Sequence, residues 1–86
     1  MDVTLYRRRL CGLCDDALFE LRALSGEMRF TIVERDIDAD ADLRARYCEI
    51  IPVVAVGDID VAHAPIDFAE LRAVLEWALG QGTTAS

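Results

Sequence analysis

The sequence predicts a single α/β domain with the element order βαβαββα. Short β-branched or alternating runs predict strands, apolar residues at helical spacing predict helices, and turn residues separate the two kinds of segment. The chain has 86 residues, of which 53% are hydrophobic. This content is enough for one small packed core and too high for a disordered chain.

The first half of the chain predicts a strand, a helix and a second strand. Residues 3–6 form a short apolar run, and residues 29–34 are partly alternating and β-branched, so both predict strands. Between them, apolar residues recur at helical spacing over residues 14–24, and Ser25-Gly26 predicts the end of the helix. One helix between two strands favours a right-handed βαβ unit with parallel strands.

The second half begins with an acidic turn that leads into a helix near residues 40–47. Two β-branched runs follow, residues 52–56 and residues 59–62. They flank Gly57-Asp58, a pattern typical of a β-hairpin whose turn needs a positive φ at the glycine. We therefore expect two antiparallel strands here.

The last predicted element is a helix that Asp67 caps and Gly80 ends. Its inner face is expected to carry the apolar residues Phe68, Leu71, Val74, Leu75 and Ala78. We expect one domain over residues 1–79 and a loose tail over residues 80–86.

The net charge of −7 excludes several classes of partner. An acidic chain is repelled by nucleic acid and by anionic membranes, so we expect neither as a partner. No apolar stretch approaches the roughly 20 residues that a membrane span needs. The first residues carry their charges after the apolar run, the reverse of a signal peptide. We expect a cytoplasmic protein that is a monomer.

Cys11-Gly-Leu-Cys14 is the motif that points to chemistry. It lies between the first predicted strand and the first predicted helix, where two thiols can form and break a disulfide without moving the fold. As a structural disulfide the pair would contribute little, since the chain-entropy model gives a stabilisation of roughly 2 kcal/mol for so small a loop. In the reducing cytosol such a pair is more often catalytic or metal-binding than structural.

The spacing predicts Cys11 as the nucleophile and Cys14, one helical turn further on, as the resolving cysteine. The attacking species is the thiolate, and the start of a helix stabilises a negative charge. Further positive charge comes from three pKa-tuning residues just upstream, Arg7, Arg8 and Arg9. Two aspartates directly after the motif act in the opposite direction. We expect the pKa of the Cys11 thiol to lie below that of a free thiol.

The other cysteine and the one histidine allow a second interpretation. A CxxC pair is half of a zinc site, and Cys48 with His63 would complete it, but the predicted layout places them far apart. We therefore expect no metal. Cys48 is expected to be a small buried hydrophobic residue, with a third redox thiol as the alternative. His63 is expected to be a packed or rim residue, with a proton shuttle as the alternative.

Taken together, these features resemble the small glutaredoxin-like proteins of the thioredoxin superfamily over roughly residues 3–79. The resemblance rests on Leu5-Tyr6, the CxxC motif, the element order, and Ile51-Pro52-Val53 at the start of the third strand. It implies a four-stranded mixed sheet with helices on both faces and a cis peptide bond before Pro52. It also implies three substrate-binding residues: Ile51, Pro52, and Arg8 at the position of the family lysine.

The chain departs from typical glutaredoxins at two places. Gly12-Leu13 stands between the cysteines, where Pro-Tyr or a similar pair is usual. Residues 62–67 lack the Gly-Gly pair that precedes the acidic residues holding the amino end of glutathione. The co-substrate is therefore left open between glutathione, another low-molecular-weight thiol, and a reductase.

We predict a thiol–disulfide oxidoreductase of glutathione or thioredoxin type that takes part in electron transport and holds no bound cofactor. Its expected partner is a disulfide-containing protein or a small thiol in a mixed disulfide. The alternative is a thioredoxin-fold binding or redox-sensing module without catalytic turnover.

Overall fold

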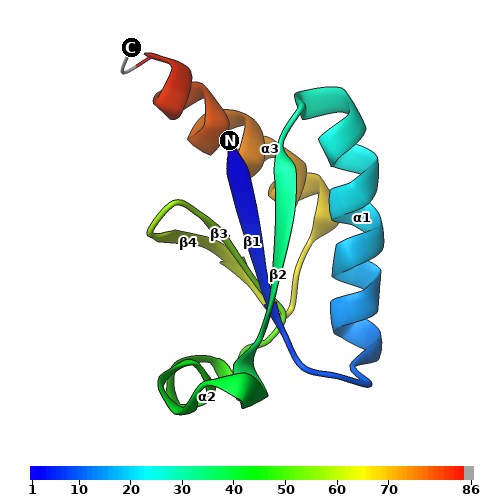
Figure 1. The fold of residues 1–86 in the computed structure, drawn as a ribbon. Helices are drawn as coiled ribbons and strands as arrows, with labels where there is room; N and C mark the ends of the chain where they lie inside the picture. Colours follow the sequence, from blue (N-terminus) through cyan, green and yellow to red (C-terminus); the bar gives the residue numbers. More distant parts are fainter. Residues whose placement is uncertain (85–86) are drawn as a thin grey trace.

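The computed structural model describes residues 1–84 of the chain. Its elements, shown in Figure 1, follow the order β1 (Asp2–Arg7), α1 (Gly12–Met28), β2 (Thr31–Asp36), the short 3₁₀ helix η1 (Ile37–Ala39), α2 (Ala41–Tyr47), β3 (Val53–Val56), β4 (Ile59–His63) and α3 (Phe68–Thr84). The predicted βαβαββα order is confirmed, with η1 as an addition. None of the helices in this part of the chain has the length and apolar character that crossing a membrane requires.

The four strands form one mixed sheet in the order β2-β1-β3-β4. Strand β1 is parallel to β2 and antiparallel to β3, and β3 forms a hairpin with β4. The parallel pair follows from α1, which returns the chain to the start of the sheet. The hairpin turn has Gly57 at φ 62°, the left-handed conformation that the sequence predicted for this glycine.

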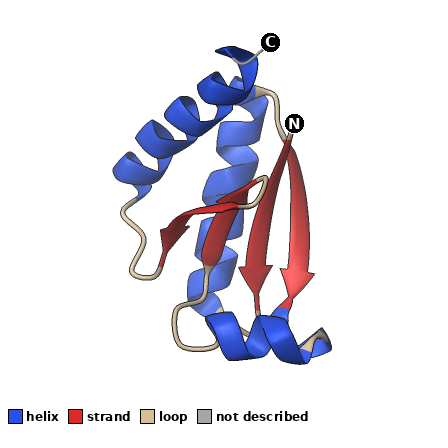
Figure 2. Cartoon of the chain, turned by 90° about the vertical axis from the view of Figure 1, so that its left-hand side faces the viewer, coloured by secondary structure: helices blue, strands red, loops and turns tan. Residues whose placement is uncertain are grey.

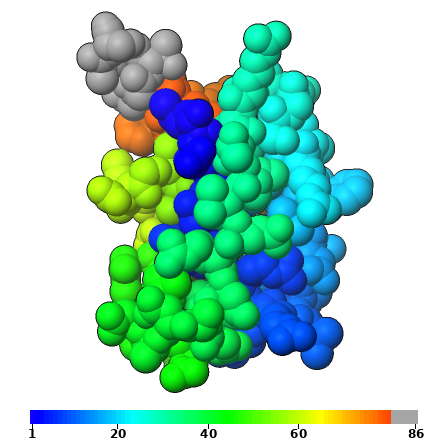
Figure 3. Space-filling view, viewed as in Figure 1, coloured from blue at the N-terminus to red at the C-terminus, as the bar shows by residue number. Residues whose placement is uncertain are grey.

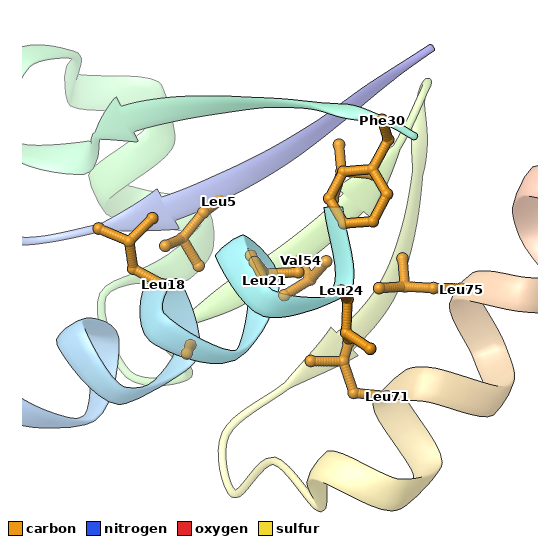
Figure 4. Packing of buried hydrophobic residues seen from close by; sticks show 10 residues of the cluster. Leu5, Leu18, Leu21, Leu24, Phe30, Val54, Leu71 and Leu75 are labelled. Atoms are coloured by element: carbon orange, nitrogen blue, oxygen red, sulfur yellow. The ribbon is translucent and has the colours of Figure 1, made fainter. Parts of the chain in front are cut away.

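Two hydrophobic clusters lie on opposite faces of this sheet because side chains alternate along a strand. Leu5 and Val54 pack against leucines of α1 and α3, as Figure 4 shows. Their neighbours Tyr6 and Val53 belong to the second cluster, with side chains of η1 and α2. The two long helices therefore cover one face, as Figure 2 shows, and α2 packs on the other. In Figure 3 the side chains of β1 and β2 reach the surface above α2 with no helix in front of them.

Helix α1 passes through Ser25-Gly26, where the sequence predicted its end, so that prediction was wrong. The hydroxyl of Ser25 donates to the carbonyl oxygen of Arg22 at 2.8 Å, and the Ser25 carbonyl oxygen accepts from the backbone N–H of Arg29 at 2.9 Å, so the serine lies within the helix. A glycine in a helix costs only about 1 kcal/mol, and the helix continues for two more residues, of which Met28 packs against the core. The helix ends after Met28, where Arg29 adopts a left-handed conformation with φ 59°.

Helix α3 also continues past the glycine predicted to end it. Its capping was predicted correctly, because the Asp67 carboxylate accepts hydrogen bonds from the backbone N–H groups of Ala69 and Glu70 at 2.9 and 3.2 Å. The helix runs to Thr84, so the loose tail expected from Gly80 onward is helical up to that residue. Residues 85–86 of that tail lie outside the described residues.

The inner face of α3 differs from the prediction at its first residue. Leu71 and Leu75 are fully buried, as expected. Phe68, which was expected beside them, is 39% exposed. Phe68 is the first residue of α3, directly after the capping Asp67. The expectation of a buried Phe68 was therefore wrong, and its side chain is available for contacts at the surface.

Candidate active site

Cys11 is the N-cap residue of α1. The chain leaves the lower end of β1 in Figure 1 and turns at Cys11 into the helix, with φ −111° and ψ 110°. The Cys11 sulfur accepts a hydrogen bond from the backbone N–H of Cys14 at 3.1 Å. It takes the place that a serine or aspartate oxygen holds in most helix caps. The unpaired N–H groups of the first turn thus face this sulfur, where a negative charge is most favourable.

Cys11 and Cys14 are joined by a disulfide, with their Cα atoms 5.2 Å apart. Cys11 is half-buried, whereas the exposed fraction of Cys14 is 0%. A molecule from solvent can therefore approach Cys11, while Cys14 is shielded behind it. This difference separates the two sulfurs by access, as an attacking thiol and a resolving thiol require.

A hollow of about 200 Å³ lies next to the dithiol motif. Pro52 is buried at this hollow, and the Ile51–Pro52 peptide bond is cis. The other lining residues come from the first turn of α1 and from the segment that ends β4 and starts α3: Leu13, Asp16, Ala64, Pro65, Ile66 and Phe68. The structure thus brings Pro52 and the CxxC segment to one hollow. It places Ile51 elsewhere, packed against the second hydrophobic cluster.

Two of the three upstream arginines are already paired with carboxylates. The guanidinium of Arg7 lies 2.7 Å from Asp15 in the first turn of α1. Arg8 donates two hydrogen bonds to Asp38, at 2.8 and 3.1 Å, and this pairing raises the pKa of Arg8 above its ordinary value. Arg9 is exposed and forms no ion pair with any residue between 1 and 84. Positive charge near Cys11 is therefore partly neutralised by the fold.

Cys48 is exposed, so the expectation of a buried hydrophobic residue was wrong. It is the residue after the last turn of α2, beyond the face on which Leu43 and Tyr47 are buried. His63 is also exposed, at the end of β4, with Nδ1 2.9 Å from the carbonyl oxygen of Ala64. Within the described residues no three His, Cys, Asp or Glu side chains are gathered as metal ligands. The Cys₃His ligand set considered from the sequence is not assembled in this structure.

Sequence reasoning missed the apolar residues around the dithiol. Leu10 is fully exposed with φ 57°, and Leu13 is 64% exposed. From the sequence, Leu13 differs from the residue usual at its position in the family motif, and Phe68 is predicted to belong to the buried face of the last helix. Leu13 and Phe68 both lie in the first turn of a helix, but so does the buried Cys14, so this position by itself does not indicate exposure.

Comparisons with known proteins show the family and the fold of this chain. A family model described as "Glutaredoxin-like domain (DUF836)" matches residues 2–76. A search of curated proteins matched none of them. The structure of target protein XcR50 from X. campestris is 31% identical with a TM-score of 0.71, over 87% of this chain and 96% of that one.

Two further solved structures share the fold. Protein Ne2328 from Nitrosomonas europaea is 28% identical with a TM-score of 0.72, over 84% of this chain and 87% of that one. Thioredoxin 1 from Thermosipho africanus TCF52B is 14% identical with a TM-score of 0.69, over 96% of this chain and 99% of that one. The last similarity shows a thioredoxin-like fold and no more.

Proposed function

We propose that this chain, which belongs to the glutaredoxin-like domain family, is a thiol–disulfide oxidoreductase with Cys11 as nucleophile and Cys14 as resolving cysteine. The observation that carries the proposal is the Cys11–Cys14 disulfide at the start of α1, in which Cys11 is half-buried and Cys14 is fully buried. A pair placed for stability would not need this difference in access. The hollow that Leu13 lines gives a substrate room next to the dithiol motif.

The proposed cycle starts from the reduced protein. The Cys11 thiolate attacks one sulfur of a substrate disulfide, whose S–S bond breaks as a Cys11–substrate disulfide forms. The other substrate sulfur leaves as a thiolate and takes a proton from water. Cys14 then loses its proton and attacks the Cys11 sulfur, which releases the second substrate thiol. Two electrons have passed to the substrate, and the protein is left in the disulfide form described above.

The surroundings of Cys11 support its role as the attacking group. Its sulfur faces the N–H groups of the first turn, which favour a thiolate over a thiol. Asp15 would repel a thiolate, but its ion pair with Arg7 offsets that charge. Asp16 would still repel the Cys11 thiolate, since no cation of the described chain lies within ion-pair distance of Asp16.

The proposal is for a cytoplasmic monomer whose partner is a disulfide-containing protein or a mixed disulfide of a small thiol. The cytosolic thiol pool would keep the dithiol reduced between turnovers. Glutathione, another low-molecular-weight thiol or a reductase would supply the electrons. Arg8 remains a proposed substrate-binding residue only if its ion pair with Asp38 opens.

The test is catalytic turnover of a protein disulfide with dithiothreitol as the final reductant. The protein should accelerate reduction above the rate of dithiothreitol alone, and Cys11→Ser should abolish that acceleration. Cys48→Ser is the matched control, because it removes an exposed thiol outside the site. A protein that becomes oxidised once and never turns over would contradict the proposal and favour a redox sensor. Replacing dithiothreitol by glutathione or by a thioredoxin reductase identifies the reductant.

A further inference from the structure

The surface next to Cys11 is unusually apolar for a small acidic protein. Leu10 and Leu13, on either side of Cys11 in the sequence, are both exposed. Phe68 is 39% exposed and lines the same hollow as Leu13 and the buried Pro52. Apolar side chains gathered around a reactive group mark a surface that another apolar group covers.

A second hollow of about 390 Å³ is lined by residues of β4 and α3 and of the segment between them. The two hollows share Pro65 and Ile66 as lining residues, so they adjoin, and together they are called the depression. A polypeptide segment would be able to contact both hollows, whereas a small thiol would contact only the one that Leu13 lines.

The charged residues of this depression are acidic. Asp16 lines the first hollow, and Asp67 and Glu70 line the second. Neither Asp16 nor Glu70 has an ion-pair partner in the described chain, whereas Asp15 and Glu27 do. The net charge of −7 adds to the same negative field. A bound segment is therefore favoured if it carries positive charge, and an anion is repelled.

We propose that the substrate disulfide belongs to a polypeptide segment in which the reacting cysteine is flanked by a large apolar residue and by a lysine or arginine. The apolar residue would cover Leu13 and Phe68, and the cation would lie near Asp16 or Glu70. This inference rests on the proposed oxidoreductase function and specifies its substrate. Glutathione has two carboxylates, one ammonium group and no large apolar side chain, so it fits this surface poorly.

The test uses peptide mixed disulfides with a neutral, coloured nitropyridine thiol. Reduced protein attacks the peptide sulfur, a Cys11–peptide disulfide forms, and the nitropyridine thiolate leaves with its colour. Four peptides of equal length carry beside their cysteine either Leu or Ser and either Lys or Glu. A fifth compound is the glutathione mixed disulfide with the same leaving group. The second-order rate constants are compared with that of a small neutral alkyl disulfide of nitropyridine.

We expect the Leu/Lys peptide to react at least about tenfold faster than the Ser/Glu peptide, the ratio expected for covering roughly half of one leucine side chain. The preference for Lys over Glu should shrink as salt rises from about 0.05 to about 0.5 M, because salt screens exposed charges. The glutathione compound should react more slowly than the Leu/Lys peptide.

Variants separate the two parts of the preference. Phe68→Ser should reduce the preference for Leu over Ser, and Asp16→Asn should reduce the preference for Lys over Glu. Phe19→Ser is the matched control, because Phe19 is 73% exposed on the same helix as Leu13 but lies outside the hollow. All three variants should react with the small alkyl disulfide, and each peptide rate is divided by this rate, so that a change in thiol reactivity alone does not count as a change in selectivity.

Equal rates for the four peptides, or a faster reaction with the glutathione compound, would overturn this substrate class while the oxidoreductase function stands. Loss of selectivity in Phe19→Ser as large as in Phe68→Ser would also overturn it. A reduced protein that reacts with none of the disulfides would overturn both proposals.

Discussion

The guanidinium of Arg7 lies 2.7 Å from the carboxylate of Asp15 and ties the end of β1 to the first turn of α1. A second carboxylate, that of Glu34 on β2, lies 3.5 Å from the same group. The side chain of Arg7 is only 16% exposed, so this arrangement is partly shielded from solvent. Arg7 therefore offsets a negative charge that stands one residue after the dithiol motif.

Replacing Arg7 by methionine should make Cys11 less reactive. The charge of Asp15 would no longer be offset, so the Cys11 thiolate would be less favourable and its pKa would rise. We expect the pKa of the Cys11 thiol to rise by roughly half a unit, so that the alkylation rate falls by about threefold at a pH well below that pKa. The measurement is the pH dependence of iodoacetamide alkylation of the reduced protein.

Arg22→Met is the control for the loss of one positive charge. Arg22 is exposed on the same helix, eleven positions after Cys11, which is roughly 16 Å along the helix and beyond the Debye length of about 8 Å. An equal effect of the two substitutions would show that the Arg7–Asp15 pair has no special role.

Replacing Cys14 by serine should trap the intermediate of the proposed cycle. Cys11 could still attack a disulfide, but the buried partner that releases the substrate would be absent. Mass spectrometry after mixing with an oxidised peptide should show one peptide bound through a disulfide, and dithiothreitol should remove it. Cys11→Ser treated in the same way should bind none at residue 14. A stable adduct on Cys14 in that variant would mean that the two roles are reversed.

Tyr47 should make the fold sensitive to alkaline pH. Its ring stacks on Tyr6 with centroids 4.6 Å apart, and its hydroxyl lies 3.2 Å from both carboxylate oxygens of Asp60. Burial, and then the charge of Asp60, raises the pKa of Tyr47 above its ordinary value. The folded state thus holds this proton more tightly than the unfolded state. Its contribution to stability is complete below about pH 10 and is lost as pH rises further.

We expect Tyr47→Phe to lose about 1 kcal/mol at pH 7, the net value of one hydrogen bond. Above about pH 10 the variant should lose stability less steeply than the natural protein. Urea unfolding of the disulfide form at both pH values measures the two slopes. Parallel slopes would show that the ionisation of Tyr47 does not limit alkaline stability.

The stability of the fold should depend strongly on the buried side chains of α1. Leu21 is fully buried in the larger cluster, where it lies with Val54 and Leu75 in Figure 4. Leu21→Ala should destabilise the fold by about 2–5 kcal/mol, a large part of the stability of a small domain. Phe19→Ala on the same helix should change it by only about 0.5 kcal/mol, because Phe19 is exposed. Urea denaturation compares the two.

Several local features were predictable because they depend on residues close together in the chain. Asp67 caps α3 as predicted, and Gly57 adopts the positive φ that its hairpin turn needs. The predicted ends of α1 and α3 were wrong, because helix ends do not depend on nearby residues alone. At Ser25-Gly26 and at Gly80 the local preference of glycine is worth only about 1 kcal/mol, and both helices continue past it.

By itself, the sequence determined the order of the elements and the position of the dithiol at the start of a helix, since both follow from spacings of a few residues. Tertiary structure alone decided what surrounds that dithiol. Leu13, Pro52 and Phe68 are far apart in the chain and meet in one hollow only when the sheet and helices pack. The same packing left Cys48 exposed and paired Arg8 with Asp38. Burial and ion pairing depend on distances in space, which local patterns do not contain.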